Sequence, residues 1–320
     1  MRIISPIDSL AEAGALLDAG ADELYGGCLP PDWSRRFSLL TSVNQRTFAG
    51  AQIASFSDLA TIVGLVHDRG RRFALTLNAP FFSDLQLPLL LDFVDQAVAT
   101  GIDAVILADL ALLRALRPRH PRLELHASTL AHLSNSAAIR FYARQGIDRV
   151  VLPRHLSVAE METITAAVDP VRCDAFLLIG KCPNTEGLCS HHHASADKVW
   201  PCEIPYAIEP IEGGPVSPRL RAAIERQGGW ARTNRRHGCG LCAIPRLQAA
   251  GIFGVKLVGR GAPTAQKVNN LLLTRDFFQL AASEADPVIY RQRARAAHRA
   301  RLGSDCSANV CYYPEFLEVD

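Results

Sequence analysis

The sequence lacks the features of a secreted or membrane protein. Its N-terminus, MRIISPIDSLAEAG, has no long apolar segment of the kind found in signal peptides. No later run reaches the roughly 18–20 apolar residues that a membrane helix needs. An excess of charge of one sign is also missing, because 34 basic and 32 acidic residues give a formal net charge of +2. We therefore expect a cytoplasmic protein without a membrane span, and its charge gives no general indication of a nucleic-acid surface.

The sequence also lacks a disulfide framework and the common hydrolase motifs. Nine cysteines are an odd number, and thiols stay reduced in the cytosol, so metal ligands or buried thiols explain them more readily than disulfides. G-x-S-x-G and H-E-x-x-H motifs are absent, which argues against the usual serine hydrolases and zinc proteases. With 48% hydrophobic residues, the 320-residue chain can nevertheless build a large packed core.

Eight short apolar segments have the composition of buried parallel strands, and helical periodicity fills most of the intervals between them. Gly20, Gly70, Gly101 and Gly146 each separate a predicted helix from the next strand, where a left-handed glycine commonly ends a helix. The pattern predicts an α/β fold of the (β/α)₈-barrel type, with an open Rossmann-like sheet as the alternative. The predicted strands are 2–5, 23–25, 73–77, 104–107, 123–126, 149–152, 175–179 and 255–258.

A long cysteine-rich segment interrupts the predicted barrel between the seventh strand and its helix. Residues 1–285 would form the barrel, including this insertion at 181–242, and residues 286–320 would form a tail that docks on it. Loops of this length inside a compact domain are usually functional or organised by a metal. The insertion is therefore the first place to look for a site.

Five cysteines lie in this insertion or at its end. Cys182 directly follows the seventh strand, Cys189 and Cys202 come next, and Cys239 and Cys242 form a pair near the eighth strand. The carboxyl ends of barrel strands share one face, so cysteines distant in sequence can meet there. Thiolates suit zinc or an iron-sulfur cluster. Because only the last pair has zinc-like spacing, the pattern favours a cluster over zinc or unliganded thiols.

The remaining cysteines leave two interpretations open. Cys306 and Cys311, in the tail, could join Cys239 and Cys28 in a second metal site. Alternatively, they could be packing residues in a tail laid over the barrel. The adjacent aromatic pair Tyr312-Tyr313 indicates that this tail docks somewhere.

Polar residues follow several predicted strands and would surround the barrel mouth. Arg154 and Arg260 could each present a bidentate guanidinium group to a dicarboxylate, or they could tie one loop to another. Asn78 and Asp109, after the third and fourth strands, would complete a polar ring.

Two further polar residues lie within or at the end of predicted strands. His126 could transfer a proton near neutral pH, or it could line the barrel as a hydrogen-bonded side chain. Lys256 is expected to point inward, because a buried lysine needs a functional or structural reason.

Two G-x-C motifs give the chain a family resemblance. Asp174-Ala-Phe176-Leu-Leu-Ile-Gly180-Lys-Cys182 and Gly187-Leu-Cys189-Ser190 resemble the signature of the collagenase-like peptidases, peptidase family U32. Further blocks follow in the family's order, and the resemblance covers about residues 2–285. These blocks are at 19–27, 126–129, 152–154 and 254–260.

The resemblance implies a barrel in which four cysteines, here Cys182, Cys189, Cys202 and Cys242, bind a 4Fe-4S cluster. It also implies an oxygen-independent hydroxylase acting on a ubiquinone precursor or a nucleobase, with prephenate as the oxygen source. The short quinone-pathway members work as heterodimers, so a family partner is implied too. A collagenase-like protease is the first alternative, although no nucleophile and base pair is evident. A zinc-organised binding module without catalytic activity is the second.

Overall fold

A computed structural model describes most of the chain. The described residues are 1–31, 33–37, 42–46, 48–182, 185–188, 214–228, 237–303 and 305–317. Cys189 and Cys202, and with them most of the predicted insertion, lie outside these ranges.

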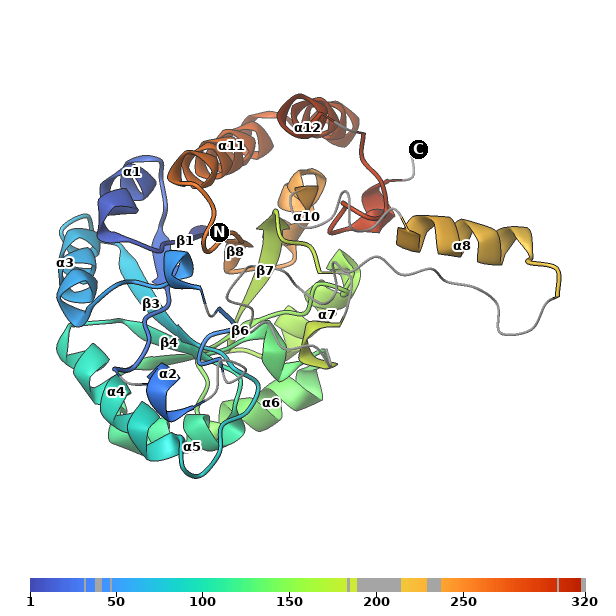
Figure 1. The fold of residues 1–320 in the computed structure, drawn as a ribbon. Helices are drawn as coiled ribbons and strands as arrows, with labels where there is room; N and C mark the ends of the chain where they lie inside the picture. The colour runs from blue at the N-terminus through green and yellow to red at the C-terminus, as the bar shows by residue number, and fades with distance from the viewer. Residues whose placement is uncertain are drawn as a thin grey trace.

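Eight parallel strands form a closed barrel in chain order, and pairing of β1 with β8 completes the circle (Figure 1). This closure confirms the predicted (β/α)₈ fold and excludes the open sheet, which would leave two edge strands. The strands are β1 (Arg2–Pro6), β2 (Glu23–Gly26), β3 (Arg72–Leu77), β4 (Ala104–Leu107), β5 (Glu124–Ala127), β6 (Arg149–Val151), β7 (Arg172–Leu178) and β8 (Gly254–Leu257).

Helices surround the strands on the outside of the barrel (Figure 1). Local signals start and stop them: Ser157 caps α7 in a capping box, and Gly146 ends α6 with φ 104°. Gly20, Gly70 and Gly101 also have positive φ, which confirms the predicted left-handed helix stops. The helices are α1 (Ala13–Asp18), α2 (Trp33–Arg36), α3 (Phe56–His67), α4 (Leu87–Ala99), α5 (Leu110–Arg119), α6 (Ser136–Gln145), α7 (Val158–Ala167), α8 (Pro218–Gly228), α10 (Ile244–Ala249), α11 (Thr264–Ser283) and α12 (Pro287–Leu302).

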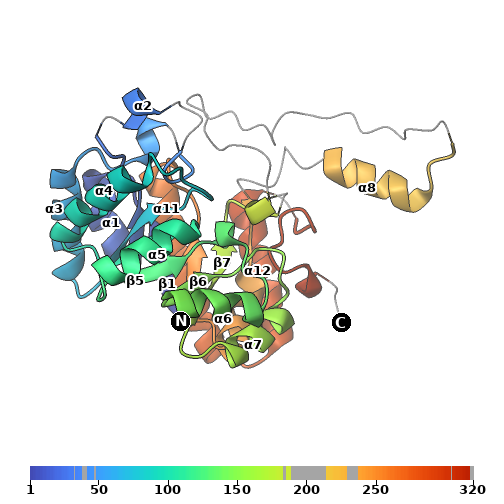
Figure 2. The ribbon, with the colours of Figure 1, turned by 90° about the horizontal axis from the view of Figure 1, so that it is seen from below.

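Two helices differ from the sequence-based prediction. The helical interval between the first two strands begins as a 3-10 turn, η1 (Leu10–Glu12), before α1. The region predicted as a tail contains α12, a helix of 16 residues that begins at an Asp286 cap. Helix α8, in the predicted insertion, projects away from the barrel in both ribbon views (Figures 1 and 2).

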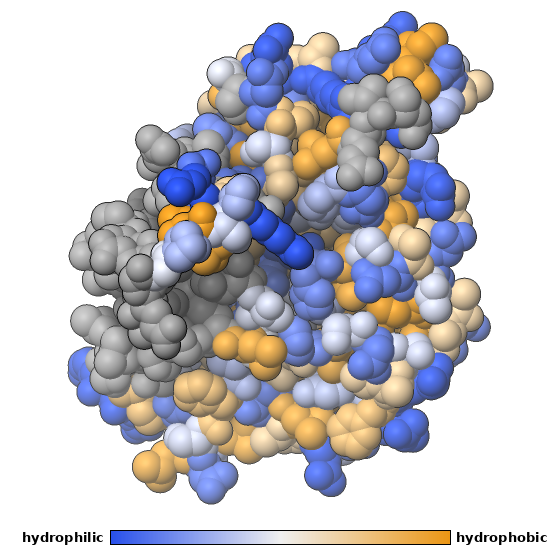
Figure 3. Space-filling view, turned by 90° about the vertical axis from the view of Figure 1, so that its right-hand side faces the viewer, coloured by the Kyte–Doolittle hydropathy of each residue, from blue (hydrophilic) through white to orange (hydrophobic). Residues whose placement is uncertain are grey.

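One stretch, Ala49–His67, has the length and mean hydropathy, 1.4, of a membrane span. It includes α3, which buries Leu59, Ile62, Val63 and Val66 in the layer between helices and strands. Barrel packing therefore accounts for its apolar face. On the face shown in Figure 3, small apolar patches lie among hydrophilic side chains, as on most folded proteins.

The segment 305–317 is attached to the end of β7. The hydroxyl groups of Tyr312 and Tyr313 donate to the carbonyl oxygens of Ile179 and Phe176, each at 2.6 Å. Lys181 Nζ donates in the other direction, to the carbonyl oxygen of Ala308 at 2.7 Å. Both tyrosines are buried, so this segment forms part of the wall beside the barrel mouth.

Candidate functional site

The chain leaves β7 through a strained turn. Ile179 has φ 47° and Gly180 has φ 67°, and a left-handed conformation is a true outlier for a β-branched residue. Two hydrogen bonds hold Ile179 there: its N–H donates to Gly238 at 2.6 Å, and its carbonyl accepts from Tyr312. The turn delivers the half-buried Cys182 to the rim of the barrel. Strain that the surroundings hold in place is typical of functional sites.

The four cysteines that the resemblance assigns to a cluster are described only in part. Cys182 lies at the rim, and Cys242 lies in η6 (Leu241–Ala243), just before α10. Cys189 and Cys202 are outside the described residues. A donor set of four thiolates is chemically suited to a 4Fe-4S cluster, and the position of Cys182 at the carboxyl end of a barrel strand fits that use.

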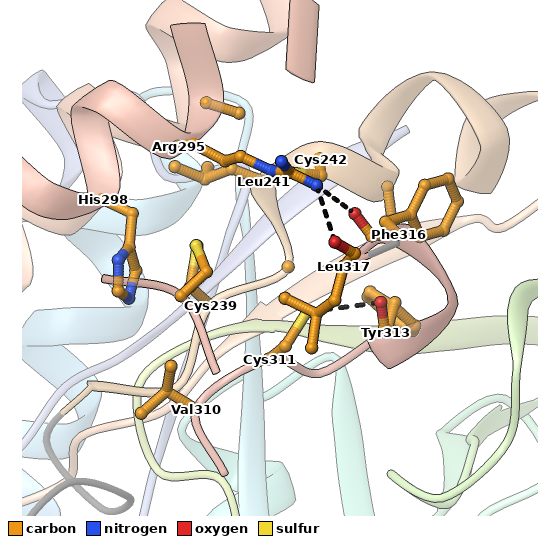
Figure 4. Close-up of a pocket in the computed structure, with 14 residues that line it drawn as sticks. Cys239, Leu241, Cys242, Arg295, His298, Val310, Cys311, Tyr313, Phe316 and Leu317 are labelled. Atoms are coloured by element: carbon orange, nitrogen blue, oxygen red, sulfur yellow. Dashed lines mark hydrogen bonds between the residues drawn. The ribbon is translucent and has the colours of Figure 1, made fainter. Parts of the chain in front are cut away.

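Cys242 lies in the wall of a small pocket together with three other cysteines. Cys239, Cys306 and Cys311 line the same pocket (Figure 4). Burial raises the pKa of the Cys242 thiol to about 11 and that of Cys311 to about 12. Cys28, the fourth member of the predicted second site, is not brought to this pocket; its sulfur lies 3.9 Å from the carbonyl oxygen of Leu29 in the barrel core.

Arg154 links the loop after β6 to the segment after β7. Its guanidinium forms an ion pair with Glu186, and it lies 3.7 Å from the centroid of the Phe176 ring. Tyr312 also hydrogen-bonds to it. The positive charge of Arg154 thus already has a carboxylate partner.

Arg260 is buried with neutral hydrogen-bond partners. Its Nη1 donates to the hydroxyl of Thr76 at 2.9 Å, and its Nη2 donates to the carbonyl oxygen of Asn44. Within the described ranges, no carboxylate lies at ion-pair distance from Arg260. The charge of Asp8 influences Arg260 from further away, and Asp8 forms its own ion pair with Lys267. Burial lowers the pKa of Arg260. The chemistry of such a buried cation allows it to accept an anion.

The polar groups after β3 and β5 offer further hydrogen bonds. Asn78 Nδ2 donates to Ser128 Oγ at 3.3 Å. Asn78 Oδ1 and Thr129 Oγ1 are buried and have no hydrogen-bond partner among the described residues. Asp109 is different, because one of its oxygens caps α5 and the other accepts from the backbone of Phe82.

His126 lies inside the barrel and its ring is fully engaged. Nε2 lies 3.0 Å from Glu124 and Nδ1 lies 3.0 Å from Arg149. Burial, with the nearby charge of Arg149, lowers the pKa of His126 to about 4. The imidazole is therefore neutral at pH 7.

Lys256 points inward, and its ammonium group lies 3.8 Å from the centroid of the Tyr25 ring. Burial lowers the pKa of Lys256, and burial also raises the pKa of Asp174. Asp174 and Glu23 are the opposite charges that act on this lysine. Lys256 thus belongs to the charged interior of the barrel.

Sequence reasoning missed the centre of that interior. Arg149 pairs with Glu23 at 2.6 Å and with Asp174 at 3.4 Å, and all three are almost completely buried. The available signal was a charged residue at or directly before the start of three apolar strand segments, Glu23, Arg149 and Asp174, which favours paired burial. Glu186, the partner of Arg154, gave no such signal because it lies in the irregular insertion.

Comparisons with known proteins find several relatives of this chain. The chain is 28% identical to a collagenase of Porphyromonas gingivalis, over 81% of this chain and 61% of that protein. It is 27% identical to tRNA hydroxylation protein P of Escherichia coli, over 59% of this chain and 38% of that protein. The chain is 26% identical to the 23S rRNA 5-hydroxycytidine C2501 synthase of E. coli, over 68% of this chain and 31% of that protein. The chain thus spans less than two thirds of each of these curated relatives.

A solved structure, that of the U32 peptidase Mk0906, matches 68% of this chain and 84% of its own, with a TM-score of 0.47 and 16% identity. The family model described as peptidase family U32 matches residues 8–308. This match includes β2 to β8, Cys182, Cys242 and α12. The chain therefore belongs to peptidase family U32.

Proposed function

We propose that this protein is an iron-sulfur enzyme that hydroxylates an aromatic ring at the barrel mouth without molecular oxygen. The observation that carries the proposal is the strained turn at Ile179-Gly180, which delivers Cys182 to the rim and is held there by Gly238 and Tyr312. Strain maintained in this way favours a functional segment over an ordinary loop. The resemblance supplies the ligand set: Cys182, Cys189, Cys202 and Cys242.

The names of several relatives support a nucleobase as the ring that is hydroxylated. Proteins named for tRNA and rRNA hydroxylation align with 59% and 68% of this chain. A quinone precursor is also an aromatic ring of suitable size, but none of these names refers to one. We therefore place the nucleobase first and the quinone precursor second.

The oxygen donor would be a small dicarboxylate such as prephenate, which the resemblance implies. Arg260 supports this part of the proposal, because its buried charge has neutral described partners and can accept a carboxylate. Asn78 Oδ1 and Thr129 Oγ1, both buried without a described partner, can orient the polar groups of the two substrates. Burial at this face excludes water from the reacting groups.

The overall reaction balances as an exchange between donor and ring. The hydroxyl group of the donor replaces a hydrogen of the ring, and that hydrogen takes the place of the hydroxyl on the donor. The ring thereby loses two electrons and the donor gains two. A bound cluster would supply one-electron transfer between them.

Anaerobic purification tests the proposal directly. We expect brown protein with about four iron and four sulfide per chain, and loss of both in Cys182→Ala. Cys28→Ala is the matched control, because Cys28 is buried in the barrel core, and it should keep its iron. A colourless wild-type protein without iron would overturn the proposal.

The activity is tested by incubating the protein anaerobically with RNA and prephenate. Nucleosides are then analysed for the mass of one added oxygen. Because the resemblance implies a family partner, the protein is tested both alone and after addition of a cytoplasmic lysate of its source cells, the compartment in which we expect it to reside. Collagen or casein cleavage that survives removal of the metal would instead support the protease that one relative's name suggests.

A further inference from the structure

Lysine is rare in this chain, and one of its lysines lies inside the barrel. Of the 34 basic side chains in the sequence, only four are lysines: Lys181, Lys198, Lys256 and Lys267. A lysine amine can lose its proton and act as a nucleophile, whereas a guanidinium stays charged in proteins. In a chain so rich in arginine, a lysine in the barrel interior is therefore a candidate for chemistry that arginine cannot perform.

Lys256 lies in the layer of the barrel interior directly beneath the mouth. It is the last residue but one of β8, and its partners in the strand register are Ile4 of β1 and Phe176 of β7. Arg154, which follows β6 at the mouth, places its guanidinium over the Phe176 ring. Catalytic side chains of this fold lie at the carboxyl ends of the strands, and Lys256 has such a position.

The charged residues deeper in the barrel are more completely buried than Lys256. Asp174 is opposite Gly254 in the register, two residues before Lys256 on the same face of the strand, and so lies one layer further from the mouth. Lys256 is 8% exposed, whereas Arg149 and Asp174 are 1% and 2% exposed. The mouth is therefore the side from which a small molecule can reach the amine.

Lys256 and Lys267 are both buried, but they differ in their partners. Lys267 forms ion pairs with Asp8 and, at 2.8 Å, with Glu12. Lys256 forms no ion pair or hydrogen bond with any described residue, and its Nζ lies 3.8 Å from the centroid of the Tyr25 ring. An aromatic ring can also accept an N–H from a neutral amine, whereas a carboxylate pair holds the ammonium form. The electron pair of Lys256 is thus the one that is available for reaction.

The surroundings favour the neutral form of this amine. Burial lowers the pKa of Lys256, and the charges of Arg149 and Arg260 lower it further. Asp174 and Glu23 act in the opposite direction, but Arg149 pairs with both of these carboxylates. Desolvation beside other cationic groups is one of the ways in which proteins activate a lysine as a nucleophile.

Arg260 indicates which class of carbonyl compound this amine would meet. It lies four residues after Lys256, near enough for its charge to act on the amine. A guanidinium that accepts a carboxylate beside a nucleophilic amine suits a 2-oxo acid, in which the ketone and the carboxylate are adjacent. Prephenate, the proposed donor, contains a 2-oxo acid group.

We propose that Lys256 binds the oxygen donor covalently, as an imine with its keto group, while Arg260 holds the adjacent carboxylate. The inference rests on the proposed function, from which it takes the donor. The amine nitrogen attacks the carbonyl carbon, a C=N bond replaces the C=O bond, and the oxygen leaves as water with the two hydrogens of the amine. Water reverses the step and releases the keto acid. No electrons are transferred, and two adjacent attachments orient the donor for the reaction.

Reductive trapping tests the imine in the whole protein. Wild type is incubated with pyruvate, the smallest 2-oxo acid, and with cyanoborohydride, which reduces an imine to a stable amine. Peptide mass mapping then locates the modified lysine. We expect one reduced pyruvate adduct per chain, on Lys256, and slower modification when prephenate is added. Lys267 is the internal control, because it is buried but ion-paired, and it should stay unmodified. An unmodified Lys256, or equal modification of all four lysines, would overturn the inference.

Two variants sharpen the assignment. Lys256→Arg keeps the positive charge but cannot form an imine, so we expect it to lose the adduct while circular dichroism shows a folded protein. If this variant fails to fold, trapping in wild type still decides. Arg260→Met should lower the preference for pyruvate over its neutral methyl ester by at least about tenfold, because only pyruvate has the carboxylate. An unchanged preference would refute the pairing of Arg260 with the imine.

Failure of this inference and failure of the proposed function give different results. Iron-containing Lys256→Arg that hydroxylates RNA as fast as wild type would refute the imine and leave the proposed function standing. Wild type without iron, in which pyruvate still modifies Lys256, would refute the proposed function and leave the imine site standing.

Discussion

The charged interior of the barrel and the polar groups at its mouth differ in how completely they are paired. Arg149, Glu23, Asp174 and His126 contact one another directly and are almost fully buried. At the mouth, Arg260 has neutral described partners, and Asn78 and Thr129 each bury an oxygen without one. In the first group the cation has carboxylate partners, so we assign it to stability, although Arg149 Nε and Nη1 and Asp174 Oδ1 make no hydrogen bond among the described residues. The second leaves capacity for a ligand.

Removing the central cation of the interior should have the largest effect. Arg149→Met leaves Glu23 and Asp174 buried without their partner, so we expect a loss of about 3–5 kcal/mol in the free energy of unfolding. Denaturant unfolding at pH 7 measures it. Arg69→Met is the control, because its ion pair with Asp18 is exposed and should contribute less than about 1 kcal/mol. Equal losses in both variants would remove the distinction between interior and surface charge.

His126 should make the protein less stable as pH falls. Its pKa is about 4 in the folded protein, below the ordinary value of about 6.5, so between these values the unfolded chain binds a proton that the folded one does not. Stability is therefore lost as pH decreases from 6.5. We expect the free energy of unfolding to fall by about 2 kcal/mol between pH 6.5 and pH 4.5. This range lies above the one in which Glu124 titrates in the folded protein.

Unfolding curves across this pH range test the expectation. His126→Gln should flatten the dependence. His155→Gln should flatten it less, because His155 is more exposed although burial lowers its pKa too. If the free energy of unfolding of His126→Gln depended on pH as strongly as that of the wild type, the His126 ring would be protonated in the folded wild-type protein.

Replacing Arg260 should weaken ligand binding more than it lowers the stability of the fold. Arg260→Met removes a buried charge that has no described carboxylate partner at ion-pair distance, so its effect on unfolding should be smaller than that of Arg149→Met. We expect at least about tenfold weaker binding of prephenate, or ~1.4 kcal/mol, measured by calorimetry. Arg154→Met is the matched variant, since Arg154 already pairs with Glu186. A larger loss of affinity in Arg154→Met would assign the carboxylate to Arg154 instead.

The sequence predicted those parts of the fold that depend on local patterns. Apolar strand segments, helical periodicity and the stops at Gly20 and Gly146 are each read from a few neighbouring residues, and they were sufficient for the barrel. Helix α12 was missed because its residues, Pro287–Leu302, include many arginines, and half of its hydrophobic residues are alanines. Its place is set by contacts such as that of Tyr290 with the carbonyl oxygen of Leu241.

The site was predictable only as a set of positions. Asn78, Asp109, Arg154 and Arg260 do follow strands, but the sequence does not say which of them are already paired. Asp109 caps a helix and Arg154 meets Glu186, and such pairings depend on side-chain geometry between distant segments. The same limit applies to the cysteines. In the sequence, Cys28 was as plausible a neighbour of Cys306 and Cys311 as Cys242 was. The fold places Cys28 in the barrel core and Cys242 in the pocket with the other two.

The attachment of the segment 305–317 has a consequence for how the molecule is made. The carbonyl oxygens of Phe176 and Ile179 accept hydrogen bonds from tyrosines that the ribosome adds 137 and 133 residues later. All eight strands have been synthesised well before those tyrosines exist. The nascent barrel thus lacks these two hydrogen bonds at the end of β7 until residues 312 and 313 have been synthesised.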